Sequence, residues 1–256
     1  MSKRKKSFIT SIILSLGFLG IQIFDVQFRF LSIGVLTLVT LILFAWSLSE
    51  GLGKDATLFV LILPTLFTLA VGLFWFLIPA TIFARLPILI FYGLGVYSLC
   101  LTMNIFTVSS IRTIALSRAA NGVGFVFTLL TSFLLYDTIL SLRAEIWFNS
   151  LFVATLSFPL FLQGLWSSSL DKKFNSRIFI YSLIFGLGLS EVSILLYFWP
   201  TTVVVGSLFL TVGVYMLLGL GQAVLEGRLF AQTVKEYLFV AIAVFLAMFI
   251  ATSWGG

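Results

Sequence analysis

The hydrophobic and polar positions of this chain alternate on the scale of whole helices. Nine apolar runs follow one another and are separated by short polar connections. They cover approximately residues 8–24, 29–48, 57–79, 86–107, 121–142, 146–166, 178–199, 201–222 and 237–254. A helix of about 20 apolar residues crosses ~30 Å of hydrocarbon. Because the runs are continuous and lack the alternation of barrel strands, the sequence predicts an all-α, polytopic transmembrane helix bundle with about nine spans.

The basic residues predict that the N-terminus lies in the cytoplasm and the C-terminus outside. In this orientation twelve Lys and Arg residues fall in inner segments, and only Arg29, Arg85 and Arg143 fall in outer ones. Short cytoplasmic loops carry such an excess of basic residues. The tryptophans agree, because all six fall at span ends, where indoles prefer the headgroup level: Trp75, Trp147, Trp199 and Trp254 at outer ends, Trp46 and Trp166 at inner ends.

The composition excludes a soluble protein and leaves no room for a separate soluble domain. Of the 256 residues, 61% are hydrophobic and 9% are charged, whereas a soluble domain carries about 25% charged residues. The sequence therefore predicts one integral membrane domain over residues 1–256, located in the cell (plasma) membrane. The net charge of +6 is dispersed among short loops, so we expect membrane lipids, other membrane subunits or a second copy as partners, and no nucleic acid.

Two acids stand inside the predicted spans, where an ionisable side chain costs at least ~2.5–3.5 kcal/mol. Asp137 lies in the fifth run and Glu191 in the seventh, both in the predicted outer half, and Arg85 and Arg143 lie near outer ends. These four residues are candidates for a substrate or proton site, and we expect Glu191 to face other helices. The alternative is that each acid pairs with a nearby Arg or hydroxyl and only holds helices together.

Weaker polar signals occur elsewhere in the chain. Arg112 and Arg118 stand beside hydroxyls and a helix start on the predicted inner side, so they are candidates for binding a phosphate or an anionic lipid, or simply anchor the topology. The segment 226–236 is predicted to form a short amphipathic helix at the inner surface. We expect interhelical hydrogen bonds from the amide side chains inside the runs, which are Asn104, Asn149, Gln22 and Gln163.

Several kinds of chemistry are absent from the sequence. It contains no histidine, a single cysteine (Cys100) and no Gly-x-x-x-x-Gly-Lys phosphate loop. Histidine-ligated zinc or haem, an internal disulfide and a P-loop ATPase are thereby excluded. The sequence accordingly predicts no catalytic residues, no cofactor and no metal site.

One stretch resembles a known family. Residues 104–120, with Ser109, Ser110, Arg112 and Arg118, continue into Val-Gly-Phe-Val-Phe-Thr-Leu-Leu-Thr at 123–131. This pattern is similar to an uncharacterised family of polytopic bacterial membrane proteins. The resemblance implies a bacterial membrane protein and carries no activity.

Three functions stay open at this point. The first is a small permease or transporter-like protein with a polar site in the outer half of the bilayer, in which Glu191 and Asp137 are coupling or substrate residues. The second is a non-catalytic scaffold or complex subunit. The third is an enzyme that acts on a lipid-linked substrate, in which an acid serves as the base and an arginine holds a phosphate.

Overall fold

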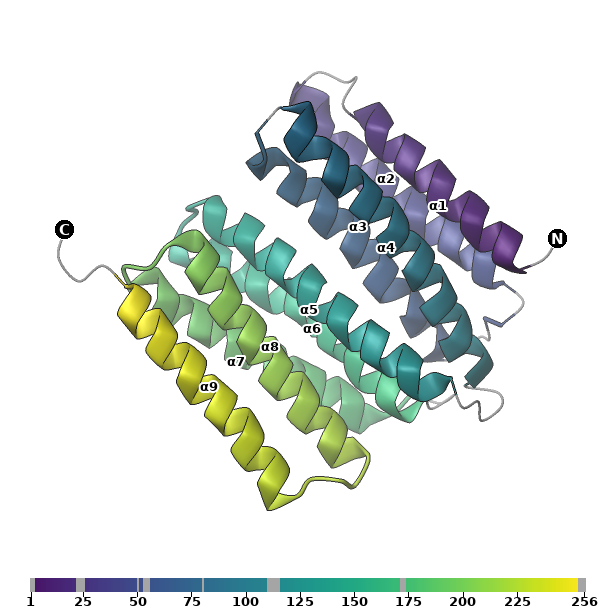
Figure 1. Ribbon diagram of the computed structural model, residues 1–256. Helices are drawn as coiled ribbons and strands as arrows, with labels where there is room; N and C mark the ends of the chain where they lie inside the picture. Colours follow the sequence, from purple (N-terminus) through teal and green to yellow (C-terminus); the bar gives the residue numbers. More distant parts are fainter. Residues whose placement is uncertain are drawn as a thin grey trace. The chain divides into compact units, whose positions relative to one another are not determined.

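A computed structural model describes residues 3–21, 26–49, 51–52, 56–79, 81–109, 116–170 and 174–252. Within these ranges the chain forms α-helices and short 3₁₀ segments, with no strand (Figure 1). The helices are α1 (Lys3–Gly20), α2 (Val26–Leu48), α3 (Ile62–Phe74), α4 (Ile82–Ser109), α5 (Ser117–Ser141), α6 (Ile146–Ser169), α7 (Ser176–Tyr197), α8 (Val203–Leu225) and α9 (Ala231–Ala251), with η2 (Ala56–Leu61) before α3 and η3 (Trp75–Leu77) after it. The all-α prediction is confirmed.

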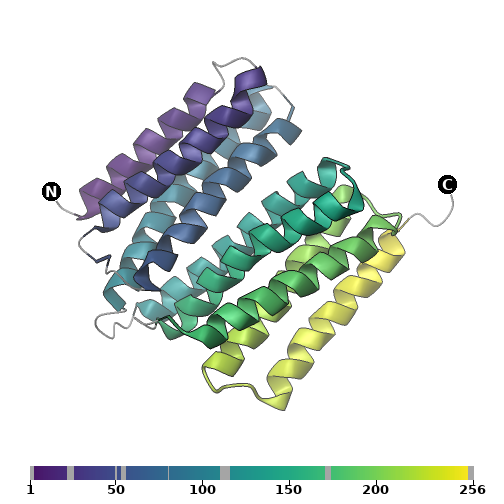
Figure 2. The same cartoon turned by 180° about the vertical axis from the view of Figure 1, so that it is seen from behind.

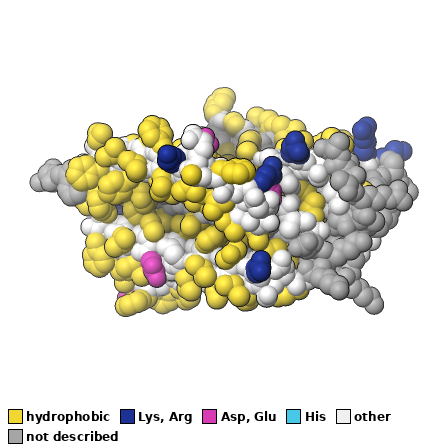
Figure 3. All heavy atoms as spheres, turned by 90° about the horizontal axis from the view of Figure 1, so that it is seen from below, with side chains coloured by type: hydrophobic (Ala, Val, Ile, Leu, Met, Phe, Trp, Pro, Cys, Tyr) yellow, Lys and Arg dark blue, Asp and Glu magenta, His cyan; other side chains and the backbone are white. Residues whose placement is uncertain are grey.

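Eight membrane-capable helices make this chain a multi-pass membrane protein. In the described part of the chain, every helical stretch from α2 onward is long and apolar enough to cross a bilayer. Hydrophobic side chains also cover much of the described surface in Figure 3. The first predicted span, α1, does not meet the same criterion, because Lys3, Arg4, Lys5 and Lys6 occupy the start of its 18 residues. The sidedness of the two termini stays a prediction.

The chain divides into two compact units, which we describe separately. The N-terminal unit comprises Met1–Phe127 and Leu170–Phe174, and the C-terminal unit comprises Thr128–Ser169 and Asn175–Gly256. Helix α5 begins in the first unit and ends in the second. Both units are built from membrane-capable helices, so the expectation of one membrane domain stays a prediction.

In the N-terminal unit α1 packs lengthwise against α2 and α4, as both ribbon views show (Figures 1 and 2). Ser11 Oγ donates to the Gly93 carbonyl of α4 at 2.7 Å. A Cβ on Gly17 would come within 2.8 Å of Leu36 on α2. The Lys6 ammonium lies 5.7 Å from the ring centroid of Trp46, near the end of α2. Helix α1 is therefore antiparallel to α2 and packs as a membrane helix does, despite its basic first turn.

The core of the N-terminal unit joins three helices through hydroxyl groups. Thr40 Oγ1 donates to Thr68 Oγ1 at 3.2 Å, and the Thr68 and Tyr92 hydroxyls are 3.1 Å apart. The Tyr92 ring stacks on Phe18 at a centroid distance of 4.8 Å. These bonds satisfy polar atoms that lipid could not, and they fix α2, α3 and α4 together.

In the C-terminal unit α6 and α7 approach each other closely. A Cβ on Gly186 would lie 3.4 Å from the Ala154 carbonyl oxygen and 3.4 Å from the Phe158 nitrogen, so the two backbones meet at this glycine. Small residues permit such contacts between membrane helices. Helix α9 lies at the edge of the unit and packs on α8, and Met248 is its buried residue.

The predicted amphipathic helix at 226–236 is wrong. Helix α8 ends at Leu225, a short connection follows, and Ala231 begins α9, which continues to Ala251 without a break. Residues 231–236 are thus the first turns of the last helix. Their polar side chains misled the sequence-based prediction because they precede the apolar part of the same helix.

Candidate functional site

A polar cavity lies at the end of the C-terminal unit where α5 ends and α7 connects to α8. Its volume is ≈ 560 Å³. It is lined by Leu140, Arg143, Asn149, Leu196, Tyr197, Trp199, Thr201, Thr202, Val203 and Gly206. The cavity therefore combines one cation, one amide and several hydroxyl groups with an apolar wall.

Arg143 brings the positive charge to the polar cavity. Helix α5 ends at Ser141, and Arg143 follows in the left-handed region with φ 47°. A non-glycine residue in this conformation costs on the order of 1 kcal/mol, and such residues cluster at functional sites. The side chain is exposed and makes no ion pair with any residue that the structure describes. Its guanidinium is therefore available to an anion.

Asn149 adds a buried acceptor to the same lining. Its side chain is 5% exposed, and its Nδ2 donates to the Ala144 carbonyl at 3.3 Å. Its Oδ1 is buried without a hydrogen-bond partner among the described residues. Such an orphaned group costs about 1–3 kcal/mol. The sequence predicts an interhelical hydrogen bond for Asn149, whereas the structure has a local bond and an unused acceptor.

The rim of the cavity is held by the connection between α7 and α8. Trp199 Nε1 donates to Thr252 Oγ1 at 2.9 Å, which ties this connection to the end of α9. Thr202 caps α8, and its hydroxyl oxygen accepts from the Val205 N–H at 3.4 Å. The rim is thus fixed by bonds within the unit and presents hydroxyl groups to the cavity.

Asp137, one of the two predicted site acids, is buried beside the cavity but does not line it. Its side chain is 6% exposed, and Ser207 Oγ donates to its Oδ1 at 3.2 Å. Leu140, near Asp137 on α5, and Gly206, next to Ser207 on α8, do line the cavity. For Asp137 the structure therefore agrees with the alternative interpretation, in which a hydroxyl group hydrogen-bonds to the acid.

Glu191 is exposed on α7, so the expectation that it faces other helices of the chain is wrong. It does not line the polar cavity either. One acid is buried and hydrogen-bonded, and the other lies on the outer surface of its helix. Asp137 and Glu191 therefore do not form a shared site in this unit.

The remaining candidates lie elsewhere. The Arg85 guanidinium lies 5.2 Å from the Trp75 ring centroid, and its Nε is buried without a described hydrogen-bond partner. Arg85 and Arg29 line a cavity of only ≈ 10 Å³, which is about the size of one water probe. Arg118 is exposed in the first turn of α5, and Arg112 lies outside the described residues.

Comparisons with known proteins give one match. A family model described as a protein of unknown function (DUF5656) matches residues 9–251. No curated protein and no solved structure matches. Among the residues that the structure describes, no group of three or more His, Cys, Asp or Glu could hold a metal ion.

Proposed function

The chain belongs to the DUF5656 family of proteins of unknown function, and we propose that it is a permease-like protein that binds a small anionic solute in the polar cavity. One observation carries the proposal: the cavity joins the unpaired Arg143 to the orphaned acceptor of Asn149. Its volume of ≈ 560 Å³ falls in the range of about 300–1,000 Å³ that small-molecule sites occupy.

The lining defines the chemistry of the ligand. A guanidinium pairs with carboxylate or phosphate through charge-assisted hydrogen bonds. Asn149 Oδ1 requires a donor, such as a hydroxyl or ammonium group on the same ligand. Thr201 and Thr202 can donate or accept. The ligand class is therefore an anion that carries a hydroxyl or ammonium group next to its charge.

The predicted orientation places this cavity on the outer face of a bacterial plasma membrane. A permease of this kind would receive its solute from outside. The lining holds no carboxylate, because Asp137 is buried behind it. The hypothesis of an enzyme that uses a carboxylate as general base beside Arg143 has less support for this reason.

The proposal is tested on the purified protein with glycerol phosphate, inorganic phosphate and glycerol as probes. We expect glycerol phosphate to raise the melting temperature, since a ligand at 100 times its Kd stabilises by about 2.7 kcal/mol. Arg143→Gln should abolish the shift. The matched control is Arg177→Gln, an exposed arginine at the other end of the same unit, which should leave it unchanged.

Two further results decide between the parts of the proposal. Equal shifts for the wild type and Arg143→Gln would overturn the site. Uptake of labelled glycerol phosphate into vesicles tests the permease. Binding without uptake would support the cavity as a binding site and contradict the proposal that the protein is a permease.

A further inference from the structure

The exposed face of α7 is an apolar stripe with one acid in it. Ile180, Ile184, Leu187 and Leu195 recur along this face, and Leu187 and Leu195 are 50% and 66% exposed. Glu191 stands between these two leucines and is exposed as well. Its neighbours on the stripe offer no polar atom to its carboxyl group.

The position of Glu191 along α7 puts this acid inside the hydrocarbon. The helix ends at Tyr197, six residues later, which corresponds to about 9 Å at 1.5 Å per residue. An ionisable residue at such depth almost always pairs with another group. The side chain is also shorter than the lysine and arginine side chains that reach the interface.

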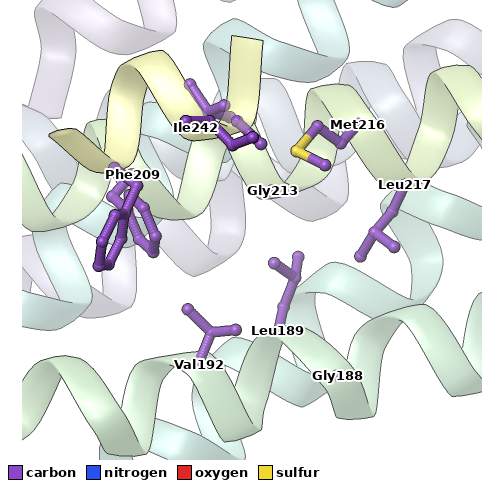
Figure 4. A pocket seen from close by; sticks show the side chains of 11 residues that line it. Gly188, Leu189, Val192, Phe209, Gly213, Met216, Leu217 and Ile242 are labelled. Atoms are coloured by element: carbon purple, nitrogen blue, oxygen red, sulfur yellow. The ribbon is translucent and has the colours of Figure 1, made fainter. Parts of the chain in front are cut away.

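An apolar groove adjoins the acid on the same unit. It is formed by α7, α8 and α9, has a volume of ≈ 450 Å³, and is lined by Gly188, Leu189 and Val192 on α7 (Figure 4). A Cβ on Gly188 would meet nothing within 4 Å. Small residues at a membrane helix surface allow another helix to approach closely.

The charge of Glu191 decides between occupants of this face. The residues that line the groove carry no polar side chain. A second copy that presented the same face would therefore set Glu191 against another Glu191. A lysine or arginine on a different chain would instead neutralise the acid within the membrane.

We propose that this face binds a transmembrane helix of a different protein, which places a basic side chain against Glu191 and apolar side chains in the groove. The inference is independent of the polar cavity and of the solute proposed for it. It gives the protein a partner-binding role beside solute binding.

Synthetic transmembrane peptides test the inference on the full chain in phosphatidylcholine vesicles. The probe is a leucine-rich peptide with one lysine seven residues from its outer end, and its control has leucine there. The protein carries a donor fluorophore at its C-terminus and the peptide carries the acceptor. We expect half-maximal energy transfer at a roughly tenfold lower content of the lysine peptide, by the tenfold-per-1.4 kcal/mol relation.

Variants separate the acid from the groove. Glu191→Leu should remove the preference for lysine, and Gly188→Leu should weaken binding of both peptides by filling the groove. Helical content and melting temperature of each variant report its folding. The double variant Glu191→Leu/Leu151→Glu moves the acid to an exposed position on α6, and it should show no preference for the lysine peptide.

Three results would overturn the inference. The first is equal binding of the two peptides by the wild-type protein. The second is restored lysine preference in the double variant, because charge alone would then explain the pairing. The third is energy transfer between two labelled copies of the protein that Glu191→Leu abolishes, which would identify a second copy as the occupant.

Discussion

The two units of this chain are built from similar apolar helices but differ in how their cores are closed. In the core of the N-terminal unit the Thr40, Thr68 and Tyr92 hydroxyls bond to one another, and the cavity beside Arg85 holds ≈ 10 Å³. A cavity of ≈ 370 Å³ in this unit lies at the basic start of α1, against Tyr97. The C-terminal unit has cavities of ≈ 450 and ≈ 560 Å³, an orphaned Asn149 oxygen and an exposed Glu191. The core of the first unit is thus closed by hydroxyl bonds, whereas the helices of the second leave ligand-sized cavities between them.

We expect an all-or-none difference in thiol labelling between the two ends of the C-terminal unit. A cysteine at Thr201 should react fully with an impermeant thiol reagent from outside, and a cysteine at Ser168 should not react. The native Cys100 is buried and should contribute little background. Equal labelling of both positions would contradict the predicted orientation and the outer placement of the polar cavity.

Truncating a tyrosine should cost more stability in the core of the N-terminal unit than at the polar cavity of the C-terminal unit. Tyr92 is 0% exposed, and Tyr197 at the polar cavity is 51% exposed. Tyr92→Ala should lower the free energy of unfolding by about 3–5 kcal/mol, because a large buried ring leaves a cavity. Tyr197→Ala should change it by less than about 0.5 kcal/mol. Unfolding in mixed micelles with rising dodecyl sulfate measures both, and similar losses would erase the contrast.

Two glycines of α7 should respond differently to the same substitution. Gly186→Leu should cost about 1–3 kcal/mol, since the added side chain meets the backbone of α6. Gly188→Leu should cost less than about 0.5 kcal/mol, because it enters open space in the groove. The same micelle titration compares them. A cost at Gly188 as large as that at Gly186 would mean that the groove is closed.

A modest gain in stability is expected from one substitution at the polar cavity. Leucine has a volume similar to that of asparagine, so Asn149→Leu keeps the packing. It removes the orphaned oxygen, whose burial costs about 1–3 kcal/mol, but it also loses the hydrogen bond to Ala144. We expect a net stabilisation of about 1 kcal/mol and loss of glycerol phosphate binding. A destabilised variant would show that Asn149 serves packing rather than a ligand.

Helix positions follow from the sequence far better than helix faces do. Runs such as 146–166 and 201–222 predict α6 and α8 within a few residues, since lipid demands continuous apolar helices. The outward direction of Glu191 is harder to predict, because the signal for the buried face of α7 is a row of small residues, Ser182, Gly186 and Ser190, rather than a contrast between apolar and polar faces. The unused acceptor of Asn149 depends on what its neighbours offer, which only the packed structure shows.

The packing of α1 has a consequence for how the chain is made. This helix starts with four basic residues, and its Ser11 bonds to the Gly93 carbonyl, 82 residues further along. A ribosome adds about 5–20 residues per second, so roughly 4–16 s separate the synthesis of the two partners. During synthesis the first helix must stay at the insertion machinery or in lipid without its main neighbour. Completion of the N-terminal unit therefore waits for α4.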